Sequence, residues 1–364
     1  MSPLPPRPAD GLPRLITYYQ TLHDDHGKPI SILPLITQPG IAVTHVILAA
    51  LHINEDPDAL TLNDHSPDDP RHQTAWAELR VLQAAGVRVL ALLGGAAKGT
   101  YERLDVGPDS SSEDAAHALA RFERYYVPLR DLVRARGLDG LDLDVEEDMS
   151  LAGIVRLIDR LRADFGPAFI ITLAPVAASL LDPTANLSGF DYEALEVLRG
   201  REIAWYNAQF YWGWGDFSSP AMYDVMVRRG WRPDRLVVGL VTNPANGSGF
   251  VGWESLEQTL AMVRSRSHDF GGIMGWEYFN SLPGDRDRPW EWARTMTALI
   301  RAHCLPAPGA GGPEAGGGAG GPAPAAEVAS KGASVVDADP DPPGGKEVDV
   351  PGAFEYYTDD EAGE

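Results

Sequence analysis

Eight short apolar runs, each separated from the next by a longer stretch, limit the folds that this chain can adopt. Most of the runs are rich in Leu and β-branched residues throughout, as expected for strands covered on both faces of a sheet. They span residues 15–21, 44–52, 87–95, 140–146, 169–175, 204–212, 236–242 and 271–278. Eight strand–helix units between Leu15 and Cys304 predict a (β/α)8 TIM barrel. An open, doubly wound sheet is the alternative, because the first crossover has room only for a short helix around Ser31 to Ile36.

The stretches between the runs carry apolar residues at three- and four-residue spacing, which is typical of amphipathic helices. Such stretches include residues 72–86, 112–137, 150–166, 255–267 and 289–303. Ser150 is placed to cap the start of one helix. Gly86, Gly137 and Gly166 stand where helix ends favour a left-handed residue. The helices therefore have start and stop signals that agree with their periodicity.

The composition changes near both ends of the chain and divides it into three parts. Residues 1–14 are Pro-rich and form a predicted N-terminal extension, and residues 15–304 form the predicted barrel domain. Residues 305–364 are dominated by Gly, Pro and Ala and contain 12 acidic and 2 basic residues. Such a segment buries too little apolar surface to offset its chain entropy. We therefore expect a disordered acidic C-terminal tail.

The formal charge of −22 argues against a nucleic acid or an anionic membrane as partner. No run of about 18 apolar residues occurs, and the N-terminus lacks the apolar core of a secretion signal. We expect a cytoplasmic protein by default, with non-classical secretion left open, and a monomer. Cys304 is the only cysteine, so an intramolecular disulfide and a cysteine zinc cluster are excluded, and we expect no cofactor.

The fourth apolar run lies in the segment GLDGLDLDVEED, from Gly137 to Asp148, which holds six carboxylates. Side chains alternate along a strand, so Asp142, Asp144 and Glu146 share one face and point into the barrel toward its carboxyl rim. Asp139 and Glu147 have the opposite parity, and Glu147 is expected in a solvated loop. Clustered carboxylates fit a divalent metal site, an acid–base pair in which one member has a raised pKa, or a structural acid ladder.

This segment resembles the DxxDxDxE signature of glycoside hydrolase family 18, whose four acids correspond to Asp139, Asp142, Asp144 and Glu146. Three further segments, LLGG, AQFYW and IMGW, resemble the family's segments on the third, sixth and eighth strands. The chain departs from the family pattern at Leu92, where the SxGG segment has Ser. The resemblance spans residues 15–303 and implies a barrel enzyme that acts on sugars.

The resemblance implies a role for each matching residue. Glu146 would protonate the glycosidic oxygen and later activate water, while Asp144 orients the substrate's acetamido group for attack on the anomeric carbon. Asp142 would share a proton with Asp144, and Tyr211 would donate its hydroxyl to the acetamido carbonyl. Trp276 would form the floor under the sugar ring.

Other positions are expected to bind substrate around these residues. Gln209 has the parity of Tyr211 and should line the same wall. The first acid of the signature, the two glycines of LLGG and one strand-end aromatic complete the predicted binding set: Asp139, Gly94, Gly95 and Tyr19. For the aromatic residues near strand ends, packing and sugar stacking are both open: Tyr18, Tyr19, Trp205, Trp212, Trp214 and Tyr278.

The resemblance leads to a retaining hydrolase of β-1,4-linked N-acetylglucosamine, with chitin or an N-acetylglucosamine-containing oligosaccharide as substrate and partner. A chitinase is the leading interpretation. An endo-β-N-acetylglucosaminidase that cuts the chitobiose core of N-glycans and a non-catalytic chitinase-like lectin are the alternatives.

Overall fold

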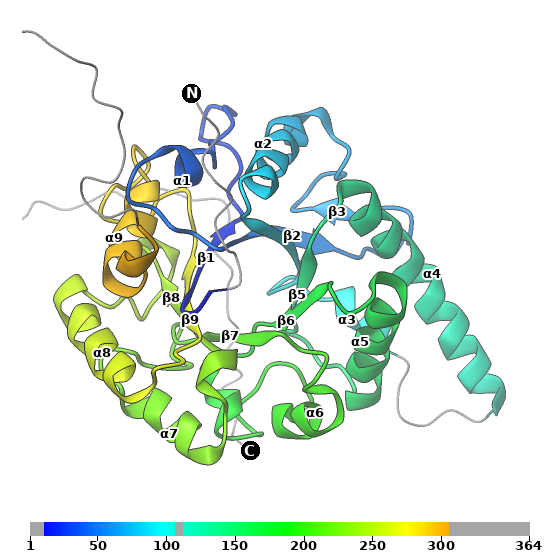
Figure 1. Ribbon diagram of the computed structural model, residues 1–364. Helices are drawn as coiled ribbons and strands as arrows, with labels where there is room; N and C mark the ends of the chain where they lie inside the picture. The colour runs from blue at the N-terminus through cyan, green and yellow to red at the C-terminus, as the bar shows by residue number, and fades with distance from the viewer. Residues whose placement is uncertain (1–10, 106–111, 306–364) are drawn as a thin grey trace, which may run out of the picture. The chain divides into compact units, whose positions relative to one another are not determined.

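The computed structural model describes residues 11–105 and 112–305, which form a closed barrel of eight parallel strands surrounded by helices (Figure 1). The sheet is closed because β1 pairs in parallel with both β2 and β9. The barrel strands are β1 (Arg14–Tyr19), β2 (His45–His52), β4 (Arg88–Gly94), β5 (Gly140–Asp144), β6 (Ile170–Leu173), β7 (Trp205–Gln209), β8 (Leu236–Val241) and β9 (Gly272–Trp276). All eight apolar runs are strands, so the predicted TIM barrel is confirmed and the open sheet is wrong.

The short strand β3 (Thr61–Leu62) pairs antiparallel to the end of β2 and was not predicted. Two residues are too few to give a periodic signal. The first crossover contains only the four-residue helix α1 (Pro34–Thr37), as its length required. The remaining helices are α2 (Gln73–Ala84), α3 (Thr100–Leu104), α4 (Ser112–Arg136), α5 (Leu151–Phe165), α6 (Tyr192–Arg199), α7 (Ala221–Arg229), α8 (Trp253–Arg266) and α9 (Trp290–Ile300).

Helix α5 illustrates how local sequence sets these elements. The Ser150 hydroxyl accepts a hydrogen bond of 3.0 Å from the Gly153 backbone N–H, which is the predicted cap. Gly166 ends the helix with a φ of 75°, a conformation that favours glycine. Between these ends, buried apolar side chains recur at three- and four-residue spacing: Ile154, Leu157, Ile158 and Leu161.

Strand alternation separates two hydrophobic clusters. On β1, Leu15 and Tyr19 belong to the cluster between strands and helices. Ile16 and Tyr18 belong to the cluster inside the barrel. Successive side chains of one strand therefore serve different layers, as the period of two requires. Polar side chains that line the active site have to point into the barrel, as the Tyr18 side chain does.

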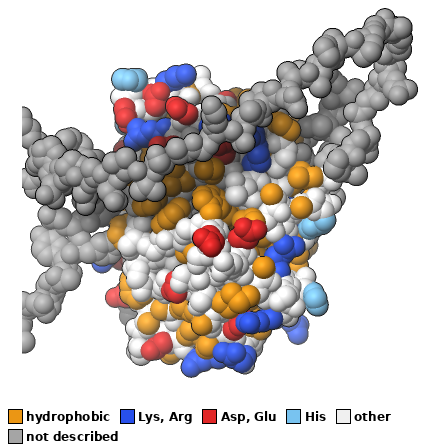
Figure 2. Space-filling model, turned by 90° about the vertical axis from the view of Figure 1, so that its left-hand side faces the viewer, with side chains coloured by type: hydrophobic (Ala, Val, Ile, Leu, Met, Phe, Trp, Pro, Cys, Tyr) orange, Lys and Arg blue, Asp and Glu red, His pale blue; other side chains and the backbone are white. Residues whose placement is uncertain are grey.

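The flank of the barrel that carries α8 and α9 mixes basic, acidic and hydrophobic side chains (Figure 2). On this face Lys and Arg side chains are spread out, so they form no continuous positive surface there. None of the helices among residues 11–105 and 112–305 combines the length and the apolar character needed to cross a membrane. Residues 1–10 of the predicted extension and residues 306–364 of the predicted tail lie outside the described residues.

Candidate active site

A row of carboxylates runs along the inner face of β5 toward the carboxyl end of the barrel. Asp142 is fully buried and Asp144 is 6% exposed, while Glu146, two residues beyond the strand, is partly exposed. Exposure therefore rises along the row. This gradient places Glu146 where barrel enzymes keep their chemistry, at the rim formed by the carboxyl ends of the strands.

Asp142, the deepest acid, accepts hydrogen bonds from side chains on three other strands of the barrel, β1, β6 and β7. Tyr18 Oη and Thr172 Oγ1 donate to it at 2.5 and 2.6 Å, and Asn207 Nδ2 donates at 3.0 Å. Burial raises the pKa of Asp142, and the three donors oppose that rise by stabilising the carboxylate. Leu92, which stands opposite Asp142 on β4, has no polar side-chain atom to donate. The donors to Asp142 come from β1, β6 and β7 instead.

Asp144 and Glu146 form a carboxyl pair that Gln209 joins from β7. Gln209 Nε2 lies 3.1 Å from Asp144 Oδ1, 3.1 Å from Glu146 Oε1 and 2.9 Å from the Ala174 carbonyl oxygen. Burial raises the pKa of Asp144 well above its usual range, and the Glu146 carboxyl raises it further. Burial also raises the pKa of Glu146.

The pairing within the row differs from the expected one. Asp144 was expected to share a proton with Asp142, whereas in the structure its carboxyl group hydrogen bonds to Glu146. Both oxygens of Asp142 accept from the Tyr18, Thr172 and Asn207 side chains. The carboxyl partner of Asp144 is therefore Glu146, which lies closer to the rim than Asp142.

The two glycines of LLGG leave room for Asp144. The Gly95 N–H donates to the Asp144 carbonyl oxygen at 2.9 Å, and a Cβ on Gly95 would lie 3.5 Å from Asp144 Oδ2. A Cβ on Gly94 would lie 2.6 Å from the same carbonyl oxygen and 2.4 Å from the Tyr101 ring. Both glycines have positive φ values, 93° and 89°. Glycine at these two positions therefore allows the backbone at the end of β4 to lie close to the acid row.

Two predicted aromatic residues face the acid row. Tyr211 is buried in the cluster inside the barrel, and its pKa is raised by burial and then by the nearby Asp144 carboxyl. Trp276, at the end of β9, is partly exposed and makes an edge contact with the Tyr18 ring at 5.4 Å between centroids. Asp144, Glu146, Gln209, Tyr211 and Trp276 therefore converge at one end of the barrel.

The structure places Asp139 and Tyr19, both expected to bind substrate, away from the acid row. Asp139 precedes β5 at the amino end of the barrel, where it accepts hydrogen bonds from Gln83 Nε2 and Val89 N–H, both at 2.8 Å, and pairs with Arg88. Tyr19 points to the helix layer and donates its hydroxyl to the Ile30 carbonyl oxygen at 2.5 Å. Both residues have the outward parity, which places them on the structural side of the sheet.

The expected solvated loop position of Glu147 is also wrong. Glu147 is buried and accepts backbone hydrogen bonds from Gly99 at 2.6 Å and Tyr101 at 2.7 Å, at the start of α3. A carboxylate stabilises the unpaired N–H groups of a helix N-terminus. Glu147 therefore fixes the loop after β4 against the loop after β5.

The strand-end aromatic residues divide between packing and exposure. Tyr278 is buried and makes an edge contact with Tyr19, and Trp205 lies under the Arg14 guanidinium at 4.4 Å. Trp212 instead is 49% exposed and has a φ of 56°, an uncommon value for a bulky residue. It directly follows Tyr211, beyond the carboxyl end of β7, and its ring lies beside Gly247.

Three residues that hold Asp142 were not assigned from the sequence. Thr172 and Asn207 are polar residues inside apolar runs, and their burial with one shared partner explains them. Tyr18 was considered only as a strand-end aromatic. Among residues 11–105 and 112–305, no three His, Cys, Asp or Glu side chains are arranged to hold a metal ion.

Comparison with known proteins gives one consistent family. No protein-family model matches the chain. A fungal endo-β-N-acetylglucosaminidase from glycosyl hydrolase family 18 is 48% identical, with a TM-score of 0.75 over 80% of this chain and 99% of that chain. A chitinase from Aspergillus fumigatus is 53% identical, with a TM-score of 0.69 over 78% of this chain and 98% of that chain.

A more distant relative is Chitinase 2 of Rhizopus oligosporus, which is 27% identical over 214 residues. The match covers 55% of this chain but 36% of that protein, so the chain corresponds to less than half of that relative. The two structural relatives are matched over nearly their whole length.

Proposed function

The chain belongs to glycoside hydrolase family 18, whose members are enzymes that hydrolyse glycosidic bonds, and from this premise we propose that it is a chitinase. Such an enzyme cleaves β-1,4-linked N-acetylglucosamine, here with retention of the configuration at the anomeric carbon. One observation carries the proposal. Gln209 contacts both Asp144 and Glu146, which sets two carboxyl groups with raised pKa values side by side at the carboxyl end of the barrel.

Glu146 is the general acid in this proposal. Its raised pKa lets it keep the proton to higher pH than an ordinary glutamic acid, and its partial exposure leaves the carboxyl group accessible to a bound glycoside. Glu146 donates its proton to the glycosidic oxygen as the bond to the anomeric carbon breaks. The resulting carboxylate then removes a proton from water.

The nucleophile is the acetamido oxygen of the substrate, which attacks the anomeric carbon and forms a cyclic oxazolinium intermediate. Asp144 accepts the acetamido N–H and balances the positive charge that develops on the ring. Tyr211, whose side chain faces the same acids, donates its hydroxyl to the acetamido carbonyl. Water then attacks the anomeric carbon from the face that the leaving group vacated, so the product keeps the β configuration.

Asp142 supports this step from below. Its three donors favour the ionised form and oppose the effect of burial, and a negative charge on Asp142 adds to the rise in the Asp144 pKa. In this proposal Asp144 and Glu146, whose carboxyl groups hydrogen bond to each other, share one proton in the free enzyme. When an acetamido N–H replaces Glu146 as the partner of Asp144, Asp144 becomes the carboxylate and the shared proton stays on Glu146, the general acid.

An endo-β-N-acetylglucosaminidase is the second candidate, because the relative that is 48% identical carries that name while the relative that is 53% identical is a chitinase. Both activities cleave the same disaccharide linkage. The sugars beyond the cleavage point distinguish them.

Parallel incubations with chitin oligosaccharides and with a high-mannose glycopeptide test the proposal, with Glu146→Gln as the inactive control. Cleavage of the oligosaccharides by the wild type supports the chitinase, and cleavage of only the glycopeptide replaces it with the second candidate. Binding of either substrate without cleavage would instead indicate a lectin and refute the hydrolase.

A further inference from the structure

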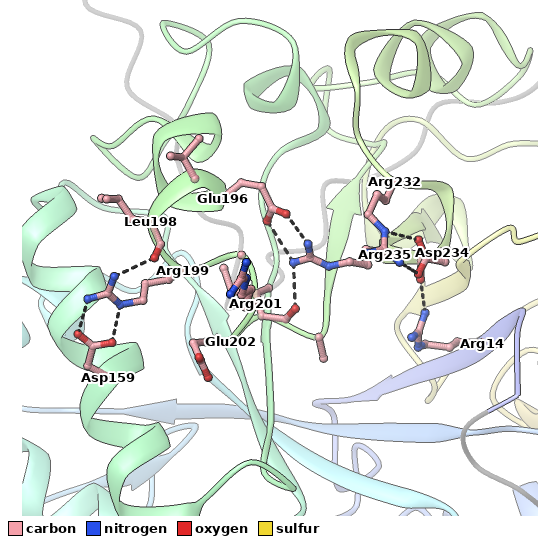
Figure 3. A pocket seen from close by; sticks show the side chains of 14 residues that line it. Arg14, Asp159, Glu196, Leu198, Arg199, Arg201, Glu202, Arg232, Asp234 and Arg235 are labelled. Carbon is pink, nitrogen blue, oxygen red and sulfur yellow. Dashed lines mark hydrogen bonds and ion pairs between the residues drawn. The ribbon is translucent and has the colours of Figure 1, made fainter.

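A charged cavity of about 780 Å³ lies at the amino end of the barrel, opposite the acid row. Its walls come from the end of α6, the segment 200–204 before β7, the turn Pro233–Arg235 before β8, and Arg14 at the start of β1 (Figure 3). Five arginines and four acids line it: Arg14, Arg199, Arg201, Arg232, Arg235, Asp159, Glu196, Glu202 and Asp234.

Each acid in this cavity is paired with an arginine. Asp159 binds Arg199 at 2.5 Å, Asp234 binds Arg232 at 2.7 Å, and Glu196 binds Arg235. Glu202 binds Arg162, which lies outside the lining residues, at 2.7 Å. These pairs neutralise the acids and hold several guanidinium groups in fixed orientations.

Arg201 is different from the other arginines of the cavity. It is exposed, and within the described part of the chain it makes no hydrogen bond or ion pair. Figure 3 shows it in the middle of the view, between the Arg199–Asp159 pair and the Glu196–Arg235 pair. The cavity therefore has an excess positive charge at its centre, although the whole chain carries −22.

The paired arginines also retain donors. A guanidinium has five N–H groups in a planar fork that suits oxyanions. Arg232 uses its Nε and Nη2 atoms to bind Asp234, and its side chain is 67% exposed. Arg201 and Arg232 can thus each present N–H groups to a ligand in the cavity without breaking an existing ion pair.

We propose that this cavity binds a tetrahedral oxyanion, a phosphate or sulfate group, with Arg201 as its principal ligand. The site is separate from the catalytic acids, since it lies at the opposite end of the strands. Hydrolysis of N-acetylglucosamine linkages does not depend on it.

Isothermal titration calorimetry of the full chain with inorganic phosphate, sulfate and glycerol 3-phosphate, at ionic strength held constant with sodium chloride, tests the proposal. We expect saturable binding at one site per chain, weakened about tenfold in Arg201→Gln because one charge-assisted contact is lost. Tighter binding of the ester than of the inorganic ions would identify a phosphorylated metabolite as the ligand.

Arg124→Gln is the matched control, since Arg124 is an exposed arginine on α4, away from the cavity. It should bind the anions like the wild type, and Arg201→Gln should keep its hydrolytic activity. Absence of saturable binding to the wild type, or equal weakening in the two variants, would overturn the proposal.

Discussion

Replacing Gln209 with Met removes the amide that joins the two catalytic carboxyl groups while keeping the length of the side chain. Gln209 Nε2 is within hydrogen-bond distance of three acceptors, namely Asp144 Oδ1, Glu146 Oε1 and the Ala174 carbonyl oxygen. An amide has two N–H groups, so two of the acceptors share one hydrogen. Gln209→Met therefore leaves all three acceptors without this donor.

The expected magnitude follows from the charge on these acceptors. Hydrogen bonds to charged groups contribute about 1.5–3 kcal/mol each, and about 1.4 kcal/mol is a factor of ten. Removing a single preorganised donor near developing charge costs about 100-fold or more in turnover. We expect kcat/KM of Gln209→Met to fall about 100-fold and the free energy of unfolding to fall by about 1–3 kcal/mol.

The pH profile has a defined direction. Donation from Gln209 favours the ionised form of Glu146 and so lowers the pKa of that carboxyl. Loss of the donor raises this pKa, and Glu146 then keeps its proton to higher pH. The alkaline limb of the kcat/KM profile on a chitin oligosaccharide should therefore move to higher pH in Gln209→Met.

Gln83→Met is the control, because Gln83 also donates to a carboxylate, Asp139, but at the amino end of the barrel. It should lower stability without moving the pH profile. An unchanged alkaline limb in Gln209→Met, or an equal displacement in Gln83→Met, would refute the reasoning.

Three further predictions follow from the same geometry. Glu146→Gln should lower kcat at least about 100-fold with an unchanged melting temperature, because the general acid is lost; near wild-type turnover would contradict its role. Burial and Glu146 raise the pKa of Asp144, so the native state retains a proton that the unfolded chain loses, and the free energy of unfolding should fall as pH rises through that raised pKa. Urea unfolding at several pH values should show a smaller fall for Asp144→Asn, and equal falls would refute the assignment. Trp212→Ala should raise KM for chitin oligosaccharides about fivefold through lost ring stacking, whereas Val197→Ala, a change at a residue 86% exposed on α6, should not.

The barrel could be predicted because strands buried on both faces are read directly from continuous apolar runs. The alternation of runs and amphipathic stretches left two topologies, and closure depended on pairing between β1 and β9, residues more than 250 positions apart. No local pattern reports such a pairing. The contact of Leu15 with Ile273 in the β1–β9 register therefore had to come from the structure.

Parity predicted which acids point inward, but not which partners they meet. Asp142 and Asp144 lie inside the barrel as the period of two required, and Asp139 lies outside by the same period although the signature includes it. The donors to Asp142 come from other strands, and their choice depends on strand register, as in the pairing of Asp142 with Thr172. Register is a property of the assembled sheet, so these contacts were beyond local reasoning.

Glu147 shows the same limit at a loop. Its position after the strand and its charge both favoured solvent. The unpaired N–H groups at the start of α3 make burial favourable, and they lie more than 45 residues earlier in the chain. A loop carboxylate buried by a distant helix end leaves no signal in the sequence around it.

The proposed nucleophile can be tested most directly by measuring kcat/KM on a series of aryl chitobiosides in which the N-acetyl group is replaced by mono-, di- and trifluoroacetyl. Fluorine withdraws electron density from the acetamido oxygen. If that oxygen attacks the anomeric carbon, kcat/KM falls steeply with each added fluorine. Equal rates across the series, together with a sugar adduct on Asp142 or Asp144 detected by mass spectrometry, would show that an enzyme carboxylate is the nucleophile and would contradict the account.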